Sequence, residues 1–173
     1  TVMNFFNLIT NKMLKTYHKN GSFLAGHVSH SVPYVEHSTG ALGHGLSVAV
    51  GCAYALKKKY SKKKSLSLCL CGDGELQEGS IWEALMFAAH HKLDNLVVLI
   101  DYNKISSITD TNKVLNLENI EKKITSFNLR PLTVDGHNVN KISNLIRKNV
   151  FKEKPLVLIC NTVKGKDIPF AEN

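Results

Sequence analysis

The sequence has few arginines, few acidic residues and no hydrophobic run that approaches the length of a membrane span. Only Arg130 and Arg147 are arginine among 22 basic residues, and 14 acidic residues leave a formal net charge of +8. Six of the lysines lie in residues 57–64, where they end a predicted helix and favour the negative end of its dipole. With no base-reading motif beside them, we interpret them as a solvated surface and expect no nucleic acid partner, a polyanion contact being the alternative.

The lack of a membrane-span pattern and of a signal-peptide pattern bears on the compartment in which the protein works. A membrane span needs about 20 apolar residues, and a signal peptide needs a basic start before an apolar stretch. The chain shows neither pattern, so we expect no membrane contact. The composition favours a reducing compartment, and we predict a cytoplasmic protein.

Cysteine is also scarce, and its positions argue against a structural zinc site. Cys52, Cys69, Cys71 and Cys160 fall inside apolar helix or strand patterns rather than in loops with metal-ligand spacing. We expect them to be small core residues. Cys69 and Cys71 share one face of a predicted strand, so their thiols should lie close together. A structural zinc ion needs about four suitably spaced ligands, which these residues do not supply.

What the chain does have is a regular alternation of helix and strand patterns. Helical spacing of apolar residues predicts helices over residues 2–18, 42–59, 80–91, 118–127 and 138–150. Short apolar runs predict strands over residues 65–71, 95–101, 129–135 and 155–161, with loops over 21–40 and 104–114. Strands alternating with helices predict an α/β fold, a parallel sheet with helices on both faces, in one domain over residues 1–173. The small residues of the 42–59 helix predict a close helix contact and association with another chain.

The most informative segment is Gly72-Asp73-Gly74, directly after the strand that ends at Cys71. Its glycines let backbone approach an anionic ligand, and Asp73 offers a hard oxygen ligand. The next strand ends at Asp101, and Asn103 follows at the same sheet edge, 103 − 73 = 30 residues after Asp73. With the carbonyl of Ile105, these oxygens form half of the octahedral set that Mg²⁺ prefers. The sequence therefore predicts a metal and diphosphate site where α/β sheets bind ligands.

Four histidines stand close together before this segment, at positions 27, 30, 37 and 44. Such a cluster could hold a transition metal. No cysteine or carboxylate cluster accompanies the histidines, so we expect surface or structural roles for His30 and His37 and leave His44 open between a structural hydrogen bond and a cofactor contact.

The sequence motifs of the chain resemble those of the transketolase family. The resemblance is carried by GDGELQEGSIWEA at residues 72–84, DYNK at 101–104, STGALGHGLS at 38–47, VDGH at 134–137 and TVKGK at 162–166. It runs from about residue 14 to the end of the chain. It implies the thiamine diphosphate-binding fold, in which this chain is the diphosphate-binding domain.

The resemblance also implies roles for individual residues. Asp73, Asn103 and the Ile105 carbonyl would hold Mg²⁺ or Ca²⁺, which bridges the diphosphate of thiamine diphosphate. Glu78 would lie near the subunit contact, and His27 would touch the substrate near the reacting carbons. The segment lining the diphosphate and thiazolium would consist of Gly40, Ala41, Leu42 and Gly74.

The implied activity is transfer of a two-carbon ketol unit from a ketose or ketose phosphate to an aldose acceptor. The family's reaction needs a glutamate from a pyrimidine-binding domain that 173 residues cannot contain. We therefore expect a partner subunit or domain, a dimer of such pairs, and a domain incomplete at both ends. The family's usual Ile-Asp-Gly after Ile105 is replaced by residues 106–110, which leaves the identity of the sugar substrate open.

Two alternatives remain at this point. The first is a subunit of another thiamine diphosphate enzyme, such as the first component of a 2-oxo acid dehydrogenase. That class shares Gly-Asp-Gly and Asn but not the Glu-Gly-x-x-Trp-Glu-Ala text at residues 78–84. The second is a non-catalytic scaffold subunit, which has no need of intact Asp73, Asn103 and His27.

Overall fold

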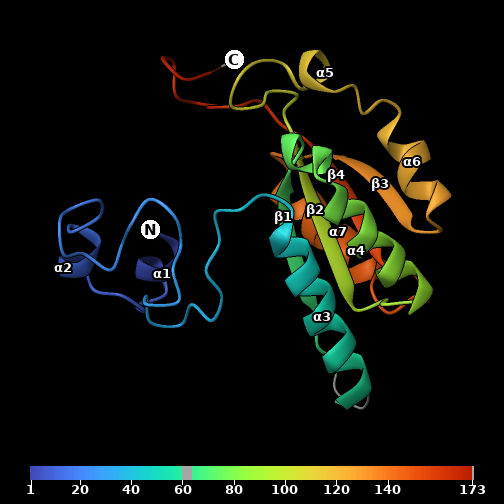
Figure 1. Ribbon diagram of the computed structural model, residues 1–173, viewed down its shortest axis with the longest axis horizontal. Helices are drawn as coiled ribbons and strands as arrows, with labels where there is room; N and C mark the ends of the chain where they lie inside the picture. Colours follow the sequence, from blue (N-terminus) through green and yellow to red (C-terminus); the bar gives the residue numbers. More distant parts are fainter. Residues whose placement is uncertain (60–63, 173) are drawn as a thin grey trace. The chain divides into compact units, whose positions relative to one another are not determined.

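The computed structural model describes residues 1–59 and 64–172 and divides the chain into two compact units, Thr1–Ala41 and Leu42–Asn173 (Figure 1). Part of the lysine-rich stretch that we predict to be a solvated surface, residues 60–63, lies outside the described residues, as does residue 173. None of the helices in the described ranges has the length and apolar character of a membrane span.

The larger unit is built on a parallel sheet of four strands in the order β1-β2-β4-β3 (Figure 1). The strands are β1 (Ser67–Gly72), β2 (Leu96–Tyr102), β3 (Arg130–Asp135) and β4 (Leu156–Asn161). The two central strands, β2 and β4, are continuous apolar runs buried on both faces, as expected for a parallel sheet covered by helices. The predicted fold class is therefore confirmed.

Helices cover both faces of this sheet. The helices of the larger unit are α3 (His44–Lys59), α4 (Gly79–His90), α5 (Thr111–Val114), α6 (Ile120–Ser126) and α7 (Val139–Asn149), with a 3₁₀ turn at Gly74–Gln77. One core cluster joins α3, α4 and α6 to one face, and a second joins α7 to the other face. The predicted close contact of the 42–59 helix is seen where Ala49 and Ala53 of α3 share the first cluster with Ala84 and Ala88 of α4.

The smaller unit contradicts one predicted element. Residues 2–18 do not form one helix; they form α1 (Val2–Phe5) and α2 (Asn11–Leu14). Asn7 takes a left-handed conformation (φ 58°), and the Thr10 hydroxyl accepts a bond from the Met13 N–H (3.2 Å), which begins a new helix. The apolar spacing of residues 2–18 therefore indicated helical structure but did not reveal the breaks that Asn7 and Thr10 introduce.

The cysteine prediction holds for three of the four residues. Cys69, Cys71 and Cys160 are buried, and the Cys69 and Cys71 sulfurs lie 3.6 Å apart on one face of β1. Cys52 is exposed, so its assignment to the core is wrong. It lies on the face of α3 that turns away from the sheet. Because small residues occupy every face of this helix, their spacing alone does not show which face is buried.

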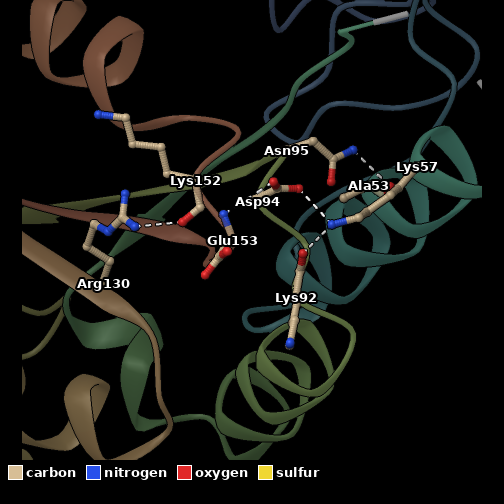
Figure 2. Close-up of polar contacts among 8 residues, drawn as sticks. All are labelled: Ala53, Lys57, Lys92, Asp94, Asn95, Arg130, Lys152 and Glu153. Atoms are coloured by element: carbon tan, nitrogen blue, oxygen red, sulfur yellow. Dashed lines mark hydrogen bonds and ion pairs between the residues drawn. The ribbon is translucent and has the colours of Figure 1, made fainter. Parts of the chain in front are cut away.

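The sheet edge opposite the Gly-Asp-Gly turn is held together by Asp94 (Figure 2). Its carboxylate accepts a bond from Lys57 Nζ at the end of α3 (2.7 Å) and from the Glu153 N–H before β4 (3.3 Å). Its carbonyl accepts a bond from the Phe151 N–H (2.8 Å). Asp94 thus joins three segments that are distant in sequence.

We expect Asp94→Ala to lower the free energy of unfolding by about 1–2 kcal/mol, because bonds to a charged, half-buried acceptor are lost at one point. Urea denaturation measures this change. The control is Lys113→Ala, which breaks the exposed pair between Lys113 and Asp110. It should leave stability unchanged. Equal effects of the two variants would show that the bonds of Asp94 to the three segments do not stabilise the fold.

Candidate functional site

A cavity of about 420 Å³ opens where β1 and β2 end, at the carboxyl edge of the sheet. Gly72 and Asp101 are paired in register at this edge, so the turns after the two strands lie beside each other. Predicted site residues on the cavity wall are Leu42, Asp73, Gly74, Glu78, Asn103 and Ile105. The thirty-residue spacing therefore brings Asp73 and Asn103 to one cavity.

Asp73 is the buried acid of this cavity, with 2% of its surface exposed. Its Oδ1 accepts the Gly74 N–H (2.7 Å), and its Oδ2 accepts the Lys104 N–H. Burial raises the pKa of the Asp73 carboxyl, and the nearby Asp101 carboxylate raises it further against the effect of these N–H donors. Neither ion pair found among the described residues involves Asp73. A buried carboxylate without a cationic side chain is suited to a metal cation.

Asn103 and Ile105 form a tight turn opposite Asp73. The Asn103 Oδ1 accepts the Ile105 N–H (2.9 Å), and Lys104 between them is left-handed (φ 66°). An amide oxygen has two lone pairs, so Asn103 keeps one for a cation. The carboxylate, amide oxygen and backbone carbonyl offered here are the hard oxygen donors that Mg²⁺ and Ca²⁺ prefer, and they therefore fit the implied metal.

The start of α3 is fixed to the same turn by Glu75, which sequence reasoning did not single out. Its Oε1 accepts the Gly43 N–H (2.8 Å), and its Oε2 accepts the Gly72 N–H (3.3 Å). Gly43 is buried and left-handed (φ 81°), which carries the chain from Leu42 on the cavity wall into the helix. The amino end of α3 is thereby held at the edge where an anionic group would bind.

Gln77 anchors the segment that directly follows residues 106–110, the loop that departs from the family pattern. The Gln77 amide donates to the carbonyls of Thr111 and Leu115, each at 3.2 Å. The Ser106 hydroxyl donates to the Thr109 carbonyl (2.6 Å), and Ile108, 86% exposed, reaches the cavity wall. The sequence could single out Gln77 only by its place in the run that begins with Gly-Asp-Gly. Its hydrogen-bond partners could not be predicted, because they lie more than 30 positions away.

The remaining predicted residues lie in the smaller unit. His27 is exposed, and a Cβ placed on Gly40 (φ 143°) would lie 3.1 Å from the His27 ring. His27 and Gly40 are thus neighbours, and Ala41 ends this unit. His30 has a structural partner, because its Nδ1 lies 2.7 Å from the Ser38 hydroxyl. In residues 1–59 and 64–172 no group of three His, Cys, Asp or Glu side chains is placed to hold a metal.

The fold and the site define a class of protein, an α/β domain with a cavity at the carboxyl edge of a parallel sheet. Residues 3–173 match the family model described as transketolase, thiamine diphosphate binding domain. The chain therefore belongs to this family.

Some of the curated relatives are named as subunits. Over 160 residues the chain is 44% identical to a subunit of the apulose-4-phosphate transketolase of Actinobacillus succinogenes, covering 92% of this chain and 57% of the relative. It is 34% identical over 163 residues to 6-deoxy-6-sulfo-D-fructose transketolase subunit SqwG of Clostridium sp. (strain MSTE9), covering 93% and 58%. The chain thus spans somewhat more than half of each of these relatives.

Solved structures give the same fold. The transketolase of Campylobacter jejuni superposes with a TM-score of 0.83 at 34% identity, covering 90% of this chain and 25% of that one. A transketolase of Leishmania mexicana superposes with a TM-score of 0.80 at 29% identity, covering 91% and 25%. The chain corresponds to about a quarter of these longer proteins.

Proposed function

We propose that the chain binds thiamine diphosphate through Mg²⁺ or Ca²⁺ and forms the diphosphate-binding part of a transketolase-like enzyme. The observation that carries this proposal is buried Asp73, which lines one cavity with Asn103 and Ile105 and takes part in neither ion pair found in residues 1–59 and 64–172. The match of the family model to residues 3–173 spans both units and supports one thiamine diphosphate-binding domain over residues 1–173.

In this proposal the residues of the chain bind and orient. Asp73, Asn103 and the Ile105 carbonyl hold the cation, and Gly74 with Gly40, Ala41 and Leu42 lines the diphosphate and thiazolium side. The amino end of α3 favours the anionic diphosphate. When bound, thiamine diphosphate supplies a nucleophilic carbon and an electron sink for breaking a carbon–carbon bond.

Two further residues have roles beyond cofactor binding. His27 donates a hydrogen bond to the substrate oxygen and stabilises charge there as the bond breaks or forms. Glu78 lies on the cavity wall directly before the first residue of α4, where we place the contact with a partner subunit. That partner supplies the pyrimidine-binding domain, and such pairs assemble into a dimer.

The proposed reaction transfers a two-carbon ketol unit from a ketose or ketose phosphate to an aldose acceptor. Relatives named for apulose-4-phosphate and for 6-deoxy-6-sulfo-D-fructose support a ketose with an anionic end, without choosing between phosphate and sulfonate. We also place the chain in a reducing, cytoplasmic setting, in which cysteines stay as thiols.

The test is a calorimetric titration of thiamine diphosphate into the full-length native chain with its partner subunit. We expect binding with Mg²⁺ and none with EDTA, because the diphosphate is held through the cation. Ketose donors are then screened with the loaded complex.

Three other results would each contradict part of the proposal. Absence of binding to the intact pair would favour a scaffold subunit. Turnover of a 2-oxo acid but of no ketose would favour a 2-oxo acid dehydrogenase component. Equal binding with and without EDTA would contradict the metal site.

A further inference from the structure

Asp101 lies behind the cavity and contacts both side-chain metal ligands of the proposed site. It is the last residue but one of β2, paired with Gly72 of β1 and Cys160 of β4, and it is absent from the residues that line the cavity. Its carbonyl accepts the Asp73 N–H (3.2 Å), and its Oδ2 accepts the Asn103 amide Nδ2 (3.2 Å). A single residue thus bonds to Asp73 and to Asn103.

The second carboxylate oxygen of Asp101 is held from another strand. Its Oδ1 accepts a bond from the hydroxyl of Thr162, which follows β4 and stands 61 positions further along the chain. The Thr162 N–H in turn donates to the Tyr102 carbonyl at the end of β2 (3.3 Å). Both oxygens of Asp101 are therefore engaged, and the side chain is fixed between β2 and the segment after β4.

This arrangement determines which way the Asn103 amide points. An ionised carboxylate only accepts hydrogen bonds, so the group that faces Asp101 must be the NH₂ of the amide. The amide oxygen is then forced to the opposite side, where it meets the Ile105 N–H (2.9 Å) on the cavity wall. The reversed amide would set two acceptors together at Asp101 and two donors together at Ile105.

We propose that Asp101, fixed by Thr162, is a positioning residue that holds the Asn103 amide with its oxygen toward the cation and so sets the metal affinity of the site. The inference rests on the proposed function, since it concerns the same cavity. Outer carboxylates that orient metal ligands and add negative charge behind them typically account for about 10–100-fold in metal affinity.

The experiment uses the full-length chain with its partner subunit in saturating thiamine diphosphate, titrates Mn²⁺ into it and follows free Mn²⁺ by electron paramagnetic resonance. Asp101→Asn removes the charge and leaves one acceptor oxygen for two donors. We expect it to weaken Mn²⁺ binding by about 10–100-fold, with full thiamine diphosphate binding restored at high Mn²⁺. Thr162→Val, which removes only the hydroxyl donor, should weaken binding by about 10-fold, and Thr162→Ser should restore it.

The matched control is Asp135→Asn, the same change at the end of β3, where the exposed carboxylate accepts the His137 N–H (3.0 Å). It should bind Mn²⁺ like the parent. Thermal unfolding without metal separates positioning from folding, because a purely structural Asp101 would lower the unfolding temperature and leave the Mn²⁺ affinity of the folded protein unchanged. That result, or parent-like Mn²⁺ binding by both Asp101→Asn and Thr162→Val, would overturn the inference alone. A parent that binds no thiamine diphosphate would overturn the proposed function with it.

Discussion

Asp73→Ala is expected to weaken metal-dependent binding of thiamine diphosphate by more than about 100-fold, since loss of a direct ligand exceeds the loss of an outer one. Asp73 is the only carboxylate of the three proposed ligands, so the variant leaves Asn103 and the Ile105 carbonyl as neutral donors. A divalent cation then lacks the charge that offsets its dehydration. Calorimetric titration with Mg²⁺, on the full-length chain with its partner subunit, measures the loss.

The fold should survive this change. The Asp73 carboxylate is buried, and burial raises its pKa, so its charge is costly when no metal is bound. Its removal relieves that cost but takes the acceptor away from the Gly74 and Lys104 N–H groups. We expect these effects to offset each other to within about 2 kcal/mol, the range of a lost helix cap.

The control for Asp73→Ala is Asp110→Ala, which removes a carboxylate that is exposed and paired with Lys113 in the loop above the cavity. It should bind thiamine diphosphate like the parent, because Asp110 is absent from the cavity wall. If Asp73→Ala bound the cofactor with parental affinity in the presence of Mg²⁺, the metal site would lie elsewhere.

Gly43→Val is expected to lower the free energy of unfolding by about 2–4 kcal/mol and to weaken cofactor binding as well. The left-handed backbone at Gly43 (φ 81°) costs a side chain about 1–2 kcal/mol, and more for a β-branched one. A Cβ there would lie 2.4 Å from Ser80 Oγ and 2.9 Å from Glu78 Cβ, so the start of α3 must move away from α4. Overpacking of this kind typically costs about 1–3 kcal/mol.

The movement would also break the bond from the Gly43 N–H to Glu75 and displace Leu42 from the cavity wall. Urea denaturation measures the stability, and calorimetry measures the cofactor affinity. The matched control is Gly51→Ala in the middle of α3, where an added Cβ would meet, among the described residues, no atom within 4 Å beyond the backbone of its own helix and its chain neighbours. It should gain about 0.5–1 kcal/mol, because alanine is the better helix former. A Gly43→Val protein as stable as the parent would show that the turn before α3 relaxes freely.

The elements of the larger unit could be predicted because their signals are local. Residues 96–100 are a continuous apolar run that burial on both sides explains, and the strand predicted over 95–101 is found as β2 (Leu96–Tyr102). The strand, the Gly-Asp-Gly turn and the thirty-residue spacing to Asn103 placed two side chains at one edge of a parallel sheet, and both line one cavity. These inferences need only the spacing of apolar residues, the polarity of the side chains and the order of the elements along the chain.

The failures occur where local pattern is ambiguous. Helical spacing over residues 2–18 gave no warning of the left-handed Asn7 or of the cap at Thr10, and the packing that would hold a long helix is absent from α1 and α2, which bury no residue. Cys52 lies in a helix whose small residues occupy every face, so its exposure depends on which neighbours α3 has.

The sequence by itself determined the parallel α/β fold, the position of the Gly-Asp-Gly turn and the chemical type of the proposed ligands, since each follows from the order and polarity of residues near one another in the chain. Only the tertiary structure decided which distant groups hold the side chains of the cavity in place. Thr162 meets Asp101 across 61 positions, and Glu75 meets Gly43 across 32. Such pairs exist because parallel strands and their crossover helices bring separate turns to one edge, and no periodicity in the sequence records which turns will meet.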